Sequence, residues 1–200
     1  MSLILPILLL SPGLALAQAG LPATPEPELC QIEPLDLEEL SELASEPFEL
    51  AADRIPSPAD VPDESLNAVV GVVTESIACT NANLPLRSLA LYTDRYLAER
   101  FSSAGGDELG HLSAAATRSP KPANAADRLT LISVANVMLL EDGRISVQVV
   151  TANAEFIFSD ILVFAETDTG WRIDQVIRGD ELVPLGTPVT TSEDSRFALG

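Results

Sequence analysis

The feature that most constrains the fold of this chain is a change in hydrophobic spacing near Arg128. Between Pro62 and Ala116, apolar residues recur every three or four positions, which places them on one face of an α-helix. After Arg128, apolar and polar residues alternate, which is the period of a strand with one buried face. Helices that precede a set of strands predict an α+β fold, with the helices gathered on one face of a sheet.

The helical half is expected to contain several separate helices, with boundaries marked by capping residues and glycines. Asp63 is a suitable N-cap for a first helix. Its inner face is marked by apolar residues at helical spacing, namely Leu66, Val70, Val73 and Ile77. Asp94 is the predicted cap of a later helix. Gly105-Gly106 breaks the chain before a weaker helix over 107–116.

Four strands joined by short turns are expected after Arg128. Asp142-Gly143 predicts a tight hairpin, because glycine accepts the positive φ that such a turn requires. A third strand is expected over 155–165, and a turn at 167–170 leads into a fourth strand over 171–177. Consecutive strands with short turns make an antiparallel meander, so the sheet is expected to have four or more strands.

Alternation in the fourth strand also predicts which side chains face the core. We expect Trp171, Ile173 and Ile177 to point inward. The charged residues between them, Arg172 and Asp174, are expected to point outward into solvent.

Residues 1–19 have the pattern of a signal peptide. An uncharged apolar run precedes Pro12-Gly13, and small residues follow, so we expect cleavage near Ala17 or Ala19 and an extracytoplasmic protein. The run is shorter than the roughly 20 apolar residues of a spanning helix, and it contains prolines. No stable membrane insertion is therefore expected after cleavage.

Residues 20–61 are acidic and rich in proline. From Glu26 to Glu64 there are 13 acidic residues and a single arginine, so this stretch carries most of the net charge of −19. The prolines oppose long helices and central strands. We expect one short helix over 35–43, which Asp36 can cap and which can dock on the domain, and we interpret the rest of the segment as a solvated linker. The compact domain is expected over 62–179, with a loosely held tail over 180–200.

The charge pattern excludes several classes of function. A nucleic-acid-binding surface needs clustered lysine and arginine, and the chain has no such cluster. Anionic membrane surfaces are disfavoured for the same reason. The acidic residues lack the spacing of a calcium-binding loop, so neither a metal nor a cofactor is expected.

Cys30 and Cys79 are the only cysteines. In an oxidising compartment these two cysteines can form one disulfide, which would link the acidic segment to the first helix of the domain. The alternative is a buried, reduced Cys79 with a free Cys30, and the sequence leaves both open.

Residues 62–179 resemble nuclear transport factor 2-like domains, a superfamily that includes the SnoaL-like polyketide cyclases. The resemblance is carried by the helical runs Val69–Asn83, Pro85–Arg87 and Ala90–Asp94, by the hairpin Asp142–Arg144 and by the ending Gly170–Ile177. The chain is also similar to secreted bacterial proteins of this type that have no assigned activity, including the lead-in Cys30–Pro34. The resemblance implies a cone in which a curved sheet wraps a long helix and leaves a pocket at one end.

Four residues are predicted to line such a pocket. Tyr92 lies at the end of the helical half where pockets of this family open. Asp160 interrupts the apolar third strand on the same face as Phe156 and Phe158. A buried carboxylate there would need a partner or a raised pKa, as functional acids often do. The structural alternative is a bulge or an edge position for Asp160, and core packing for the aromatic residues.

Asp160, Asp94 and His111 are the candidate catalytic residues. His111 is the only histidine and is flanked by glycine in a stretch expected to be mobile, with no partner to orient it. Asp94 is explained more simply by a role as a helix cap. We therefore favour structural roles for Asp94 and His111, and for Asp160 as well.

The leading functional hypothesis is an exported, non-catalytic module that binds a small apolar ligand or another protein. The alternative is a SnoaL-like isomerase, cyclase or hydrolase that acts on a small apolar substrate in the cone pocket. A homodimer formed through the sheet is a further expectation that the resemblance implies.

Overall fold

The computed structural model describes residues 22–104, 106–179 and 183–184. Its elements are the 3-10 turn η1 (Pro27–Leu29), the helices α1 (Leu37–Leu43), α2 (Asp63–Asn81), α3 (Pro85–Leu89), α4 (Asp94–Ala104) and α5 (Gly106–Ala116), and the strands β1 (Thr130–Leu139), β2 (Ile145–Ala152), β3 (Phe156–Thr167), β4 (Gly170–Arg178) and β5 (Val183–Pro184). The predicted α+β class is confirmed. The predicted signal peptide and most of the predicted C-terminal tail lie outside the described residues.

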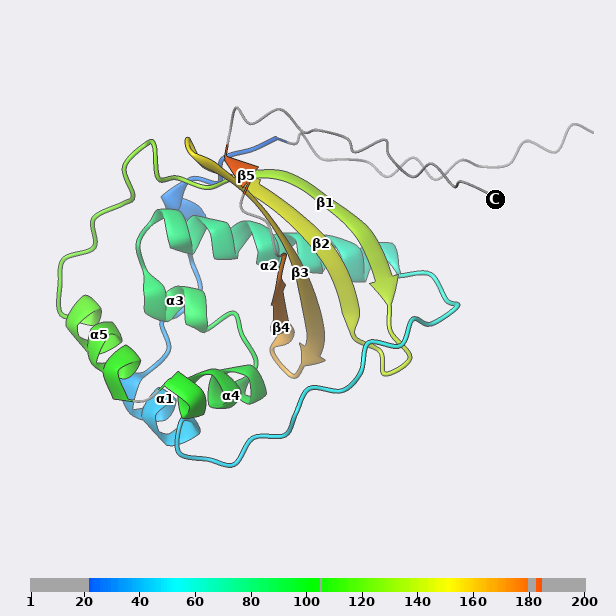
Figure 1. Cartoon of the computed structure of the whole chain (residues 1–200), viewed down its shortest axis with the longest axis horizontal. Coiled ribbons are helices and arrows are strands. Elements are labelled where there is room, and N and C mark those ends of the chain that lie inside the picture. The colour runs from blue at the N-terminus through cyan, green and yellow to red at the C-terminus, as the bar shows by residue number, and fades with distance from the viewer. Residues whose placement is uncertain (1–21, 105, 180–182, 185–200) are drawn as a thin grey trace, which may run out of the picture.

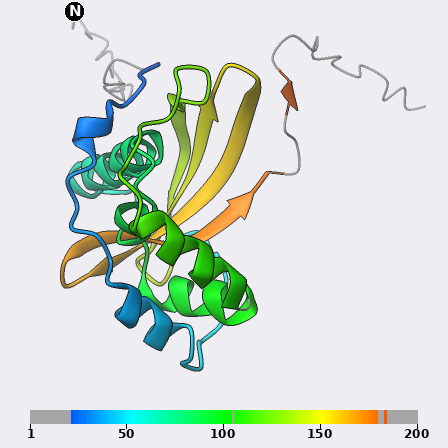
Figure 2. The same cartoon turned by 90° about the vertical axis from the view of Figure 1, so that its left-hand side faces the viewer.

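The strands form one antiparallel sheet in the order β1-β2-β3-β4, and β5 pairs with the start of β3. The sheet is curved, and α2 lies across its concave face (Figure 1). Figure 2 shows the helices gathered on one side of the sheet. Of the helices, α2 and α4 contact the strands, whereas α1 and α5 pack on other helices.

The main core lies between α2 and the sheet. Val69, Val73 and Ile77 project from α2 at helical spacing and are almost fully buried. They pack against inward residues of the four long strands, namely Leu131, Ile145, Val147, Val149, Phe164 and Ile173. This apolar burial is the dominant favourable term for the fold.

A β-bulge at Asp174 changes the predicted faces of β4. Val163 pairs with Gln175, whereas the next residue, Phe164, pairs with Ile173, so Asp174 is an extra residue without a partner of its own. An extra residue inverts the inward–outward pattern beyond it. Trp171 and Ile173 therefore face the core as predicted, but further along the strand the pattern changes.

Two predictions for β4 are wrong as a result. Ile177 pairs with Ile161 on the outward face, while Val176 packs against the main core. Asp174, which was expected to face solvent, has only 5% of its surface exposed.

The helix starts confirm one predicted cap and correct another. The Asp36 carboxylate accepts a hydrogen bond from the Glu38 amide at 2.7 Å, so it caps α1 as predicted. Asp94 is the first residue of α4 rather than its cap. The capping group is the Thr93 hydroxyl, which accepts from the Tyr96 amide at 3.2 Å. Asp63 likewise lies in the first turn of α2, after Pro62.

Residues 22–61, the N-terminal strap, pack along the domain instead of forming a solvated linker. One end pairs with the start of β1, where Ala23 and Leu131 exchange two backbone hydrogen bonds of 3.0 and 2.7 Å. The other end of the strap pairs with the last residue of β1, where the Ser57 amide donates to the Leu139 carbonyl at 2.8 Å. Between them the strap follows the helical side of the molecule (Figure 2).

The middle of the strap is anchored by α1 and by a disulfide. Leu40 of α1 is fully buried beside Leu97 and Phe101 of α4. Cys30 and Cys79 are bonded, which decides between the two alternatives that the sequence left open. Both cysteines are buried, and Cys79 comes from the last turns of α2. The strap is therefore part of the folded unit.

Removing the buried side chain of the strap should destabilise the whole domain. We expect Leu40→Ala to lower the free energy of unfolding by about 3 kcal/mol, because it leaves a cavity at the α1–α4 contact. Leu50→Ala in the same strap is the matched control, since Leu50 is 81% exposed and its loss should cost less than about 0.5 kcal/mol. Urea denaturation measures both, and equal stabilities for the two variants would contradict a docked strap.

The disulfide should stabilise the domain by constraining the unfolded chain. It closes a sequence separation of 49 residues, for which the chain-entropy model gives about 4 kcal/mol. We expect the Cys30→Ser/Cys79→Ser variant to lose a stability of this order in urea denaturation. A reductant should lower the stability of the wild type and leave the double variant unchanged; a wild type indifferent to the reductant would count against this account.

Candidate functional site

A cavity of about 650 Å³, here called the cone cavity, lies between α2 and the concave face of the sheet. Its apolar walls come from both layers and include Val73, Ile77, Val149, Leu162, Ile173 and Val176. Polar residues also line it, namely Ser76, Thr80, Tyr92, Thr151, Ser159, Asp160 and Arg178. An apolar cavity with a few polar groups is typical of small-ligand sites, and its volume lies in their usual range of about 300–1,000 Å³.

Three of the four predicted pocket residues meet in this cavity. Tyr92, Phe158 and Asp160 all line it, although they come from distant parts of the chain. Phe156 does not line it. It lies at the start of β3 opposite Pro184, with its ring centroid 6.2 Å from that of Phe158. A ligand role for these residues stays a prediction.

Tyr92 is held in the turn between α3 and α4. Its amide donates to the Leu89 carbonyl at 3.0 Å, and its ring stacks on Tyr96 with centroids 4.9 Å apart. Burial, helped by the neighbouring Tyr96, raises the pKa of the Tyr92 hydroxyl above its ordinary value, against the opposing influence of Arg100, Ser76 and Arg178. Tyr92 is therefore neutral near pH 7 and can donate a hydrogen bond into the cavity.

Asp160 and Arg178 form the charged end of the cavity. They are paired positions on β3 and β4, and both line the cavity. Just beyond them the Gly179 amide donates to the Ser159 carbonyl at 3.0 Å. A Cβ on Gly179 would lie 2.3 Å from that carbonyl oxygen, so only glycine allows the backbone after β4 to approach β3 this closely.

Sequence reasoning missed Arg178. The simple alternation of β4 carries no sign that residue 178 faces inward, because the bulge at Asp174 reverses the faces beyond it. The bulge is visible only in the register between β3 and β4, and the sequence of β4 alone does not show that register.

The structure does not bring the other two catalytic candidates to the cone cavity. Asp94 is exposed at the first turn of α4. His111 is exposed on α5, within a helix rather than a mobile loop. Neither lines the cone cavity.

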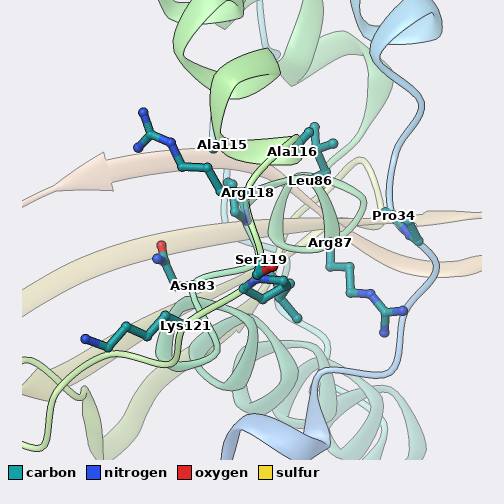
Figure 3. A pocket seen from close by; sticks show the side chains of 12 residues that line it. Pro34, Asn83, Leu86, Arg87, Ala115, Ala116, Arg118, Ser119 and Lys121 are labelled. Atoms are coloured by element: carbon teal, nitrogen blue, oxygen red, sulfur yellow. The ribbon is translucent and has the colours of Figure 1, made fainter.

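Two more cavities lie among the helices. The α3–α5 cavity, of about 240 Å³, is bounded by Leu89, Tyr92, Arg100, Glu108 and Leu112, among others. The second, of about 470 Å³, lies where α3 faces the chain after α5 and has Arg87, Arg118 and Lys121 at its rim. In Figure 3 the side chains of Arg118 and Lys121 extend to one side and that of Arg87 to the other. These cations do not converge on one point, so they do not form an anion site.

A buried ionic cluster lies around Asp174. One carboxylate oxygen accepts from the Thr93 hydroxyl and from Arg95 Nε, each at 2.9 Å, and the other accepts from Arg144 at 3.0 Å. Arg144 also donates to the carbonyl of Ala52 in the strap at 2.8 Å. The cluster therefore joins β4, α4, the β1–β2 hairpin and the strap.

The same contacts explain the ionisation of Asp174. Burial alone would raise the pKa of its carboxyl, but hydrogen bonds from Arg95, Thr93 and Arg144 and the charge of Arg95 outweigh burial, so the pKa lies below its ordinary value. Because each oxygen is already paired, the carboxylate is stabilised as a structural anion. We assign this cluster to the fold and not to catalysis.

No group of three or more histidine, cysteine or acidic side chains in the described part of the chain is arranged to hold a metal ion. None of the helices within the described ranges is long and apolar enough to cross a membrane. Comparison with models of protein families, with curated proteins and with solved structures finds no match for this chain.

Neutralising Asp174 should weaken the domain in a pH-dependent way. We expect Asp174→Asn to lose about 2 kcal/mol at neutral pH, because hydrogen bonds to a buried carboxylate are lost or weakened. The pKa of Asp174 is lower in the folded than in the unfolded chain, so the unfolded chain takes up the proton first as the pH falls. The contribution of Asp174 to the free energy of unfolding is thus fully present above the pKa that its carboxyl has in the unfolded chain, and it is lost on acidification below about pH 4.

Urea denaturation at a series of pH values tests this expectation. The stability difference between wild type and Asp174→Asn should shrink as the pH falls below about 4. Asp168→Asn, in an exposed turn, is the control and should show no such trend. A difference that stays constant down to acid pH would contradict the role of the carboxylate charge.

Proposed function

We propose that this chain is an exported binding module of the nuclear transport factor 2-like type, and that its cone cavity takes a small, mainly apolar ligand. The observation that carries the proposal is the cavity itself, whose apolar walls are contributed by α2 and the concave sheet. Tyr92, Asp160 and Arg178 supply a hydrogen-bond donor and two opposite charges with which to orient a polar group of the ligand.

Export is supported by two independent features. The first is the signal-peptide pattern of residues 1–19. The second is the Cys30–Cys79 disulfide, since such bonds persist in oxidising compartments and are rare in reducing ones. A secreted or periplasm-like location would place the cavity in contact with molecules outside the cytoplasm.

The proposal favours binding over catalysis because of the polar groups in the cavity. Its lining residues include no histidine and no cysteine, and the carboxylate of Asp160 has the oppositely charged Arg178 as its cross-strand neighbour. A nucleophile with an adjacent general base is the usual signature of covalent catalysis, and the lining residues include neither a cysteine nucleophile nor a histidine base.

A neutral fluorescent dye that brightens in apolar surroundings, such as Nile red, tests the proposal. We expect the wild type to bind it with micromolar affinity and Ser76→Phe, which fills the cavity from α2, to bind about tenfold more weakly. Asn67→Phe adds the same ring to an exposed position of the same helix and is the matched control. Equal binding by both variants, or no binding by the wild type, would refute the cone cavity as the site.

A catalytic alternative has one specific observation in its favour, which is that Asp160 and Tyr92 line the same cavity. In a SnoaL-like isomerase, cyclase or hydrolase, Asp160 would serve as acid or base while neutral Tyr92 donates a hydrogen bond. The Asp160→Asn variant separates the two functions. If the protein is a binding module, neither the wild type nor Asp160→Asn changes the ligand chemically. If it is an enzyme, the wild type converts the ligand and the Asp160→Asn variant does not.

A further inference from the structure

We propose that Tyr92 is a partition between two compartments of one elongated binding site, and that its side chain limits the length of the ligand. This inference rests on the proposed function, because it takes the cone cavity to be the ligand site. It adds a second compartment, the α3–α5 cavity, and a ligand class, an unbranched aliphatic molecule with a neutral polar head group.

The two cavities share a wall. Tyr92 lines both the cone cavity of about 650 Å³ and the α3–α5 cavity of about 240 Å³, and Thr80 of α2 also lines both. Thr80 is short and exposed, so the larger part of the shared wall is the tyrosine ring. The α3–α5 cavity continues the apolar lining beyond that ring with Leu89 and Leu112.

The backbone around Tyr92 is fixed, so the wall depends on the side chain. The two flanking residues bond to β4: the Leu91 carbonyl accepts from the Ile173 amide at 2.8 Å, and the Thr93 amide donates to the Ile173 carbonyl at 3.0 Å. The ring itself stacks on that of Tyr96, with the two ring centroids 4.9 Å apart. Truncating the side chain therefore opens the wall without releasing the loop.

The two ends of the joined site indicate what kind of ligand it fits. Asp160 and Arg178, at paired positions on β3 and β4, give this part of the cone cavity one charge of each sign and no net charge, so a neutral polar head group is favoured there over an ion. The α3–α5 cavity ends at an ion pair in which Arg100 Nε donates to Glu108 at 3.1 Å. Aliphatic side chains line both cavities, among them Leu162 and Val176 in the cone cavity and Leu89 and Leu112 in the α3–α5 cavity, which suits an alkyl chain.

Displacement of Nile red by straight-chain primary alcohols, from hexanol to dodecanol, tests the partition. The wild type should bind more tightly with each added carbon up to a limiting length and gain nothing beyond it. In Tyr92→Ala the limiting length should increase. Alcohols longer than the wild-type limit should bind this variant about tenfold more tightly than they bind the wild type, as expected for about two more buried methylene groups. Tyr92→Phe retains the ring and should retain the wild-type limit.

Further variants make the result specific to the second compartment. Adding Leu112→Trp to Tyr92→Ala refills the α3–α5 cavity and should restore the shorter limit. Tyr92→Leu serves the same purpose as Tyr92→Ala if thermal melting shows that the alanine variant is unfolded. The same limiting length in the wild type and in the truncated variants would overturn the partition while leaving the proposed function intact. A wild type that binds neither dye nor alcohol would refute the proposed function itself.

Discussion

The bulge at Asp174 governs both the stability and the site of this domain. One extra residue in β4 turns a carboxylate inward at the sheet edge, where Thr93, Arg95 and Arg144 satisfy its oxygens. The same residue reverses the strand beyond it, so that Arg178 faces the cavity. A regular strand would leave the arginines of the cluster without their shared anion and would remove the positive charge from the cavity end.

The N-terminal strap depends on that cluster at one point and on covalent and apolar contacts at others. Arg144 connects Asp174 to the strap carbonyl of Ala52, while Cys30 is bonded to α2 and Leu40 is buried against α4. These anchors hold in place a segment whose negative charges repel one another. Its acidic side chains are mostly exposed, so the fold keeps the favourable contacts of the strap and leaves its charge in solvent.

The cone cavity is what remains between α2 and a sheet that curves away from it. Small and polar residues of α2, such as Ser76 and Thr80, leave space that larger side chains would fill. Tyr92, which comes from the α3–α4 turn, lines both this cavity and the α3–α5 cavity. In the proposed function, ligand binding and the limit on ligand length would both depend on these few side chains.

Much of this protein follows from local sequence patterns. The change of hydrophobic period predicts helices followed by an antiparallel sheet, Asp36 marks the start of α1, and alternation in β3 places Phe158 and Asp160 on one face. These features depend on neighbours in the chain, which is why the sequence alone determines them. The pairing of Cys30 with Cys79 was open, because either state is compatible with the same local sequence.

Only the tertiary structure decided the rest. The docking of the strap and the burial of Asp174 both depend on groups far apart in the chain. The bulge is the clearest case, since it is defined by the register between two strands and not by the residues of either strand alone. Local pattern selects which elements form, whereas long-range pairing sets their register, and register decides which side chains meet in the cavity.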